Sequence, residues 1–266
     1  KKLILDLRNN GGGVLQSATM IADEFLPKGR IMLKTKGRKE QEKIYYSTSG
    51  GELESIDAVV LINAFSASAS EILAGALQDN DRAIIVGRRS YGKGLVQEDS
   101  PMRDGSNLRI TIARYYTPSG RCIQKPYSGN YEEYMQDEVR MEKGEMYHLD
   151  SSLYLDSLKF KTIGGRTVYG GGGITPDVFV PYDTTESSFY LTELLFSGAF
   201  QSYSFDFVAN KRNYWKNPQD FCSRFVCNDN ILQAFVSYAN KTGGVSKNNK
   251  EFIRSKRVIS TNLKAE

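Results

Sequence analysis

The sequence predicts a mixed α/β core followed by a helical extension. Its clearest pattern is an apolar run at 58–62, an apolar helical repeat at 72–77 and a second apolar run at 83–86. Short β-branched runs are typical of buried strands, and apolar residues three or four apart are typical of a helix. After Asp183 the pattern changes to aromatic residues at helical spacing. We therefore expect a strand–helix–strand core and a separate helical part.

The N-terminal segment predicts a strand, a helix and a hairpin. Residues 3–7 form a short apolar run, and residues 14–26 repeat apolar side chains at helical spacing. The apolar face of this helix is expected to carry Val14, Leu15, Ala18, Ile21, Ala22, Phe25 and Leu26. Residues 31–35 and 43–48 flank a charged turn, so we expect them to pair as two antiparallel strands.

Composition narrows the class of protein. A hydrophobic content of 40% and a charged content of 25% are typical of a soluble globular chain. The net charge of +4 is mild and no basic stripe is interleaved with aromatics, so we expect no nucleic-acid partner. A single histidine argues against an ordinary zinc site, and we expect neither metal nor cofactor. Because the chain begins directly on a predicted strand, we expect it to be an excerpt of a longer protein.

A serine and a lysine stand where chemistry could use them. Ser68 immediately precedes the predicted helix, and Lys93 lies in a glycine-flanked loop after the next strand. A helix N-terminus offers unpaired N–H groups to an oxyanion, and a serine becomes a nucleophile when a base takes its proton. The sequence Ser68-Ala69-Ser70-Glu71 is equally a capping box, in which Ser68 only caps the helix. The local pattern alone favours capping.

Three segments in register resemble the carboxyl-terminal processing (tail-specific) peptidases, which are Ser–Lys dyad serine proteases of the S41 type. They are residues 65–72 (FSASASEI), Gly87 and residues 91–97 (YGKGLVQ). The resemblance implies that Ser68 is the nucleophile, Lys93 the general base and Gln97 the residue that holds the lysine. Tyrosine stands where the family usually has phenylalanine before Gly-Lys-Gly. The resemblance also implies a crotonase/ClpP-like α/β core.

The dyad sets an energetic requirement on Lys93. Lowering a lysine pKa from about 10.4 to about 7 costs about 4.6 kcal/mol. Burial can supply a shift of this size without a metal. The expected apolar walls are Ile84, Ile85, Val86, Leu95 and Val96. A neutral Lys93 would then take the Ser68 proton and return it to the leaving amine.

The glycine-rich loop at 8–13 has several interpretations. It does not match the dinucleotide-binding pattern because Gln16 occupies the third glycine position, and such loops often serve tight packing. Residues 6–13 (DLRNNGGG) are similar to the family motif L-D-L-R-x-N-P-G-G, whose glycine amide lines the oxyanion hole. This resemblance assigns the role to Gly12, paired with the amide of Ala69. Gly11 stands where the family usually has proline.

Further segments of the core are expected after Gln97. Residues 102–107 predict a turn and residues 108–116 a strand. Residues 115–121 and 173–177 resemble the family's Y-x-T-P-x-G and G-I-x-P-D segments. Residues 126–169, between these segments, form a polar insert that we expect to be surface helix and loop. It contains His148 and Asp150. A Ser–His–Asp triad is conceivable, but surface decoration is the favoured interpretation of this histidine.

The chain is expected to divide into a protease core at 1–182 and a helical extension at 183–266. The aromatic residues of the extension are expected to form a core or a docking surface, not a binding box. Among the three cysteines, Cys222 and Cys227 are the favoured disulfide pair, although buried free thiols are an equal alternative.

The resemblance implies a serine endopeptidase that cleaves proteins near their C-termini. The alternatives are a catalytically silent peptide-binding scaffold of the same fold and, less favoured, a crotonase-type acyl-CoA enzyme. The resemblance implies protein or peptide tails as substrates, an upstream PDZ domain in the full-length protein and an extracytoplasmic location in the bacterial periplasm or envelope. A homo-oligomer is possible from the sequence.

Overall fold

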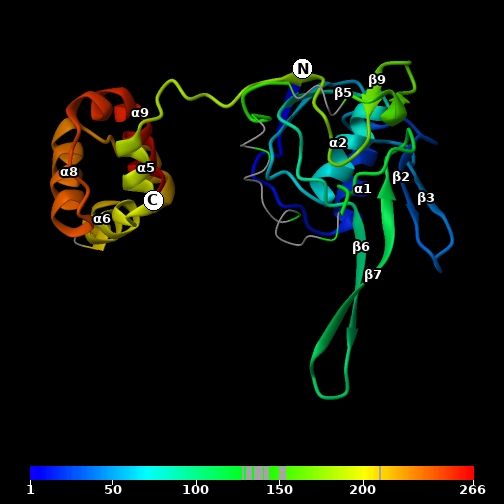
Figure 1. The fold of residues 1–266 in the computed structure, drawn as a ribbon, viewed down its shortest axis with the longest axis horizontal. Coiled ribbons are helices and arrows are strands. Elements are labelled where there is room, and N and C mark those ends of the chain that lie inside the picture. The colour runs from blue at the N-terminus through cyan, green and yellow to red at the C-terminus, as the bar shows by residue number, and fades with distance from the viewer. Residues whose placement is uncertain (128, 130–133, 135–139, 141–143, 150–153, 210) are drawn as a thin grey trace. The chain divides into compact units, whose positions relative to one another are not determined.

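A computed structural model describes residues 1–127, 129, 134, 140, 144–149, 154–209 and 211–266. These residues form two compact units, Lys1–Tyr182 and Asp183–Glu266 (Figure 1). The first unit contains sheets and helices and the second is helical. The predicted class, a mixed α/β core followed by a helical part, is confirmed.

A parallel sheet forms the centre of the first unit. Its strand order is β1 (Lys2–Asp6), β4 (Asp57–Ile62), β5 (Ala83–Gly87) and β10 (Val178–Phe179). Leu5 lies opposite Val60, and Val60 opposite Ile85, so one apolar row crosses three strands. Because the strands are parallel, the loops that follow β1, β4 and β5 all leave from the same edge of the sheet.

Two helices pack on one face of this sheet. They are α1 (Leu15–Phe25) and α2 (Ala69–Asp79), and every residue of α2 is buried. Ala22 and Phe25 of α1 join Val60 and Ile85 in a single core. The predicted apolar face of α1 is wrong at two positions, since Val14 and Ile21 are 62% and 44% exposed. The buried residues of α1 lie in a stripe about 100° wide that faces the core, and these two residues lie outside it.

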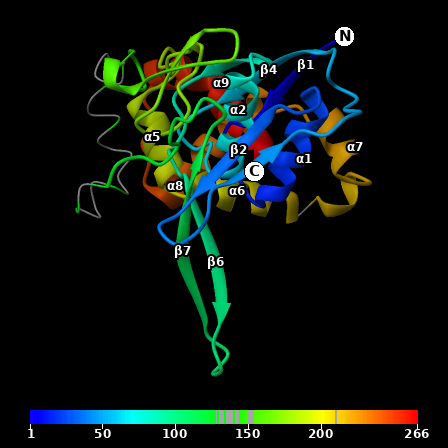
Figure 2. The ribbon, with the colours of Figure 1, turned by 90° about the vertical axis from the view of Figure 1, so that its right-hand side faces the viewer.

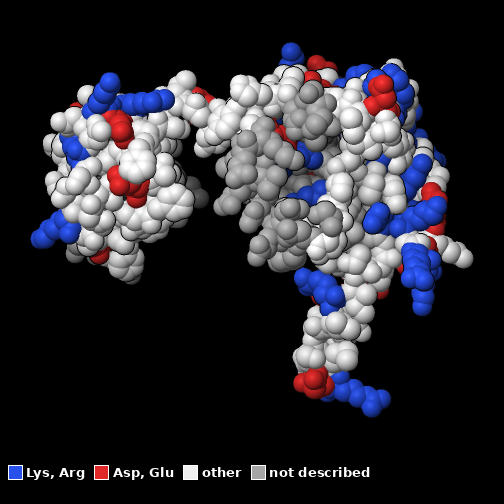
Figure 3. Space-filling view, viewed as in Figure 1, with Lys and Arg blue, Asp and Glu red and all other residues white. Residues whose placement is uncertain are grey.

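A second, antiparallel sheet has the order β3 (Lys43–Tyr46), β2 (Ile31–Lys36), β7 (Asn107–Tyr116) and β6 (Leu95–Pro101). The predicted hairpin of β2 and β3 is confirmed. Strands β6 and β7 form a long hairpin that extends away from the rest of its unit in both views (Figures 1 and 2). Its tip carries side chains of both charge signs (Figure 3).

The described part of the polar insert contains a β-hairpin. Strands β8 (Lys159–Lys161) and β9 (Thr167–Tyr169) pair after the 3₁₀-helix η2 (Asp156–Leu158). The expectation of helix and loop is therefore wrong for this part, and residues 128, 130–133, 135–139, 141–143 and 150–153 lie outside the described residues. After Gly173, Ile174 is fully buried and Asp177 accepts a hydrogen bond from Ile85 N at 2.8 Å. The G-I-x-P-D segment thus leads into β10 beside β5.

The second unit consists of helices around an aromatic core. They are α5 (Phe189–Phe196), α6 (Ala199–Ala209), η3 (Arg212–Tyr214), α7 (Pro218–Arg224), α8 (Asp229–Gly243) and α9 (Asn249–Ala265). The rings of Phe200 and Phe235 stack at 4.7 Å in its centre. All three cysteines are free, so the Cys222–Cys227 disulfide is absent, and Cys222 is exposed. Within the described residues, no helix combines the length and apolarity needed to cross a bilayer.

Candidate active site

Ser68 lies in a strained turn between β4 and α2. Its backbone has φ 57° and ψ −117°, a region that residues other than glycine rarely occupy. Such a conformation costs on the order of 1–3 kcal/mol and persists only where the surrounding structure enforces it. The side chain is half-buried. Its hydroxyl faces the Glu71 amide as in a capping box, but without a cap hydrogen bond of normal geometry.

Hydrogen bonds to the loop after β1 enforce this turn. The Ser66 hydroxyl donates to Leu7 O at 2.7 Å and accepts from Asn63 N at 2.9 Å. Asn10 O accepts from Ala67 N and from the Ser70 hydroxyl, each at 3.0 Å. The segments on both sides of Ser68 are thereby bonded to a loop that is distant in sequence, since the bonded residues are 59 and 60 positions apart.

Gly12 packs directly against the Ser68 turn. Its φ is +87°, and a Cβ atom there would lie 2.4 Å from Ala67 O and 2.6 Å from Ala69 N. Only glycine fits so close an approach. The Gly12 amide already donates to Asn10 Oδ1 at 2.9 Å, whereas the Ala69 amide donates to no group among the described residues. The structure thus brings Gly12, Ser68 and Ala69 together, with one of the two expected oxyanion donors engaged elsewhere.

Lys93 does not lie in the apolar, buried pocket that the sequence analysis predicted. Its side chain is exposed, and its Nζ forms no hydrogen bond or ion pair with the residues that the structure describes. Of the expected walls, Ile84 is itself 43% exposed. The Lys93 backbone is nevertheless fixed, because its N–H donates to Glu71 Oε2 at 2.8 Å. The expected desolvation of the amine is therefore not supplied by these residues.

Gln97 does not hold Lys93 in this structure. It is exposed, and its Nε2 donates to Thr111 Oγ1 at 3.4 Å. The reason is strand register, since Gln97 lies directly opposite Thr111 in the β6–β7 ladder. No hydrogen bond joins Gln97 to Lys93 among the described residues.

Glu71 is the site residue that sequence reasoning missed beyond its capping role. It is fully buried, and its Oε2 accepts from Ser68 N and Lys93 N, both at 2.8 Å. Its Oε1 accepts from Gly92 N and from the Ser90 hydroxyl, both at 2.6 Å. Burial raises the pKa of the Glu71 carboxyl, against the opposing effect of these donors. One side chain therefore joins the backbones of Ser68 and Lys93.

A buried charge cluster fixes the start of the Lys93 loop. Glu145 accepts paired hydrogen bonds from Arg89, at 2.7 Å on each oxygen, and from Arg140 at 2.6 and 3.1 Å. Arg140 also donates to Arg89 O at 2.8 Å. Burial acts to raise the pKa of Glu145, but the two arginines outweigh it and lower the pKa to about 2.

We expect Glu145 to make the core sensitive to acid. The pKa of Glu145 is lower in the folded protein than in the unfolded chain. Its contribution to the free energy of unfolding is therefore complete above about pH 4.5 and is lost as the pH falls toward 2. After allowance for screening, about 2 kcal/mol should be lost. Urea unfolding between pH 2 and 7 should show Glu145→Gln destabilised at neutral pH, with the gap from wild type closing in acid. Asp99→Asn, in an exposed pair, is the control. A gap that does not change with pH would contradict the assignment.

His148 is exposed and Asp150 lies outside the described residues, so the structure gives the triad alternative no support. Within the described ranges, no three side chains of the metal-ligating kinds lie together.

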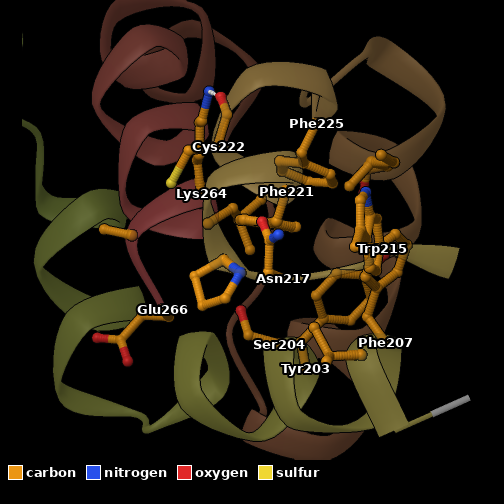
Figure 4. A pocket seen from close by; sticks show the side chains of 15 residues that line it. Tyr203, Ser204, Phe207, Trp215, Asn217, Phe221, Cys222, Phe225, Lys264 and Glu266 are labelled. Atoms are coloured by element: carbon orange, nitrogen blue, oxygen red, sulfur yellow. Dashed lines mark hydrogen bonds between the residues drawn. The ribbon is translucent and has the colours of Figure 1, made fainter. Parts of the chain in front are cut away.

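A cavity of about 440 Å³ lies wholly within the helical unit. Phe207 and Trp215 lie on one side of it, and Cys222, Lys264 and Glu266 on the other (Figure 4). The Ser204 hydroxyl, also in its lining, is buried without a hydrogen-bond partner among the described residues. The aromatic residues of this unit are therefore divided between a core and the wall of a cavity.

The two parts of the chain match the models of two different families. Residues 1–129 match the model of peptidase family S41. Residues 190–266 match a family of unknown function, DUF8443.

Curated relatives match the first part. A carboxy-terminal-processing protease of Bartonella bacilliformis is 50% identical over 125 residues, which is 47% of this chain and 29% of the relative. A carboxyl-terminal-processing protease of Synechocystis sp. is 45% identical over 46% of this chain and 28% of its own length. A chloroplastic C-terminal processing peptidase of Tetradesmus obliquus is 42% identical over 46% of this chain and 26% of its own length. The chain thus spans less than a third of these relatives.

Among solved structures, the photosystem II D1 C-terminal processing protease is similar, with a TM-score of 0.48 and 28% identity. The match covers 69% of this chain and 36% of that one.

Proposed function

We propose, from the match of residues 1–129 to the model of peptidase family S41, that this chain carries the catalytic part of a serine endopeptidase that processes protein C-termini. The observation that carries the proposal is the strained Ser68 turn, linked to Lys93 through Glu71 and closely packed by Gly12. Strain of this kind, enforced by contacts from distant segments, is a feature of functional sites.

In the proposed mechanism, neutral Lys93 accepts the Ser68 proton as Ser68 Oγ bonds to the substrate carbonyl carbon. The C–N bond then breaks, and Lys93 donates the proton to the leaving amine. Water hydrolyses the resulting acyl-enzyme through the same base. The amides of Ala69 and Gly12 stabilise the oxyanion, which for Gly12 requires release from Asn10.

The exposure of Lys93 gives bound substrate a further role. A peptide lying over the Ser68 turn would cover the amine and exclude water from it. Gln97 would turn from Thr111 to Lys93 in the same step. An upstream PDZ domain and an extracytoplasmic location belong to this proposal by resemblance alone.

The exposed Lys93 and the engagement of Gln97 with Thr111 favour one second candidate, a catalytically silent scaffold that binds peptides. Such a protein would keep the fold and bind tails without cleaving them.

Cleavage of an unfolded protein by the full-length enzyme separates the two candidates. Ser68→Ala and Lys93→Ala should each lower kcat by about 10³-fold or more, because a nucleophile and its base act as a unit. The exposed Lys36→Ala is the matched control and should leave kcat unchanged. Mass spectrometry with a slowly turned-over ester should find an acyl adduct on Ser68. Equal cleavage by all variants would remove the dyad, and tail binding without cleavage by wild type would identify the scaffold.

A further inference from the structure

A cavity of about 610 Å³ opens at the carboxyl edge of the parallel sheet. Three loops form one side of it: residues 6–9 after β1, residues 63–65 after β4, and Arg88 after β5. Met146, Tyr147 and Tyr182 complete the wall. Parallel sheets bind their ligands at this edge because the loops that follow the strands converge there.

Arg88 brings an uncompensated positive charge to the cavity. Its Nη1 donates to Val180 O at 3.2 Å, and its guanidinium lies 5.5 Å from the centre of the Tyr182 ring. No carboxylate among the described residues pairs with it, whereas the adjacent Arg89 is paired with Glu145. The guanidinium is partly desolvated, and burial lowers its pKa. A bound anion would offset this cost directly.

The other charges of the cavity cancel. Arg8 and Asp6 form a bidentate pair, with Nη2 to Oδ2 at 2.7 Å and Nε to Oδ1 at 2.9 Å. The net charge of the charged side chains in the lining is therefore +1, from Arg88. This charge suits a single carboxylate, because a phosphate would leave an excess of negative charge.

The floor of the cavity is pre-organised by an amide pair. Asn63 Nδ2 donates to Asn9 Oδ1 at 2.8 Å, and Asn63 Oδ1 accepts from Asn9 N at 3.0 Å and Phe65 N at 3.1 Å. Asn9 holds a φ of 58° to make these contacts. Because these bonds are already formed, the cavity keeps its shape without a ligand.

The loop after β4 leads directly into the Ser68 turn, and the loop after β1 is hydrogen-bonded to that turn, so the cavity and the nucleophile are close. Phe65, which is 56% exposed, precedes Ser68 by three residues. Three residues separate two Cα atoms by at most about 11 Å. A peptide whose scissile bond lies at Ser68 therefore reaches the cavity within about three or four extended residues.

We propose that this cavity is a subsite for a carboxylate of the peptide substrate, with Arg88 as its counter-ion. The inference rests on the proposed peptidase function and adds a substrate class to it: peptides with a negative charge within a few residues of the cleaved bond. The carboxylate can be the chain terminus or an Asp or Glu side chain, since the chemistry of recognition is the same.

Peptide binding to full-length protein carrying Ser68→Ala tests the subsite without turnover. Three fluorescent peptides are compared by anisotropy: one with a free C-terminus, its C-terminal amide, and the amide with Glu at its last position. We expect Arg88→Gln to weaken binding of the carboxylate-bearing peptide by about tenfold or more and to abolish its advantage over the plain amide. Arg88→Lys should keep part of that advantage. Arg38→Gln, the same change at an exposed loop residue, should have no effect.

The outcomes separate this inference from the peptidase function. Equal binding of all three peptides, or an advantage that survives Arg88→Gln, overturns the subsite even if wild type still cleaves. An advantage that depends on Arg88, found in a protein without cleavage, supports the subsite and removes the peptidase function. The peptide that shows the dependence identifies the source of the carboxylate. If Arg88→Gln does not fold, the comparison of acid and amide peptides, with the partial effect of Arg88→Lys, decides.

Discussion

Replacement of Glu71 by glutamine should lower kcat/KM by about 100-fold or more while the protein remains folded. The carboxylate accepts from four donors, two on each oxygen. A carboxamide has one acceptor oxygen, so its NH₂ group must face two of these donors. In one orientation Ser68 N and Lys93 N lose their shared acceptor, and in the other Gly92 N and Ser90 do. Either way the two loops shift, and a misplacement of about 1 Å costs on the order of 100-fold in rate.

The division of the loss between kcat and KM distinguishes this positioning role from simple destabilisation. In Glu71→Gln, kcat should fall while KM stays close to its wild-type value, because the lysine backbone is no longer held beside Ser68. Glu24→Gln is the matched control, since the Glu24 carboxylate accepts a single amide, Glu52 N at 3.0 Å, outside the site. An unchanged kcat in Glu71→Gln would show that the shared carboxylate has no part in positioning the dyad.

The sequence predicted those parts of the site that depend on local pattern. The apolar runs and helical repeat located β4, α2 and β5, and hence the place of Ser68 immediately before α2. Resemblance placed Gly12 near Ala69, and the structure agrees because a Cβ on Gly12 would meet the Ala69 amide. Local pattern could not have done so, since the two residues belong to loops that follow different strands.

Other features depend on contacts that no local pattern records. Glu71 has the spacing of an exposed capping residue, but it is fully buried and accepts from Gly92 and Lys93, which lie more than twenty residues away. Gln97 faces Thr111 because of the register between β6 and β7, which sequence spacing does not fix. The strands β8 and β9 have three residues each, too few for a period to be detected.

Arg121 should be the most costly residue of the core to replace. Its side chain is 1% exposed, and its Nη2 lies 2.7 Å from Oδ1 of Asp79, whose side chain is fully buried. It also donates to Gln78 Oε1 at 2.5 Å and Tyr169 O at 3.1 Å. Arg121→Met leaves the Asp79 carboxylate buried without its counter-ion, which should lower the free energy of unfolding by about 3–5 kcal/mol. Arg109→Met, in an exposed pair with Asp99, should have a far smaller effect, because water screens that pair.

Removal of both charges should restore part of that loss. In Arg121→Met/Asp79→Leu no buried charge is left alone, and packing of similar volume replaces the pair. Recovery stays incomplete because Ser119 N, which donates to Asp79 Oδ2 at 3.0 Å, loses its acceptor. Urea unfolding followed by circular dichroism measures the effect, while the single tryptophan, Trp215, reports on the helical unit and should not shift. A double variant less stable than Arg121→Met would mean that hydrogen bonds to Asp79, and not its charge, determine the stability there.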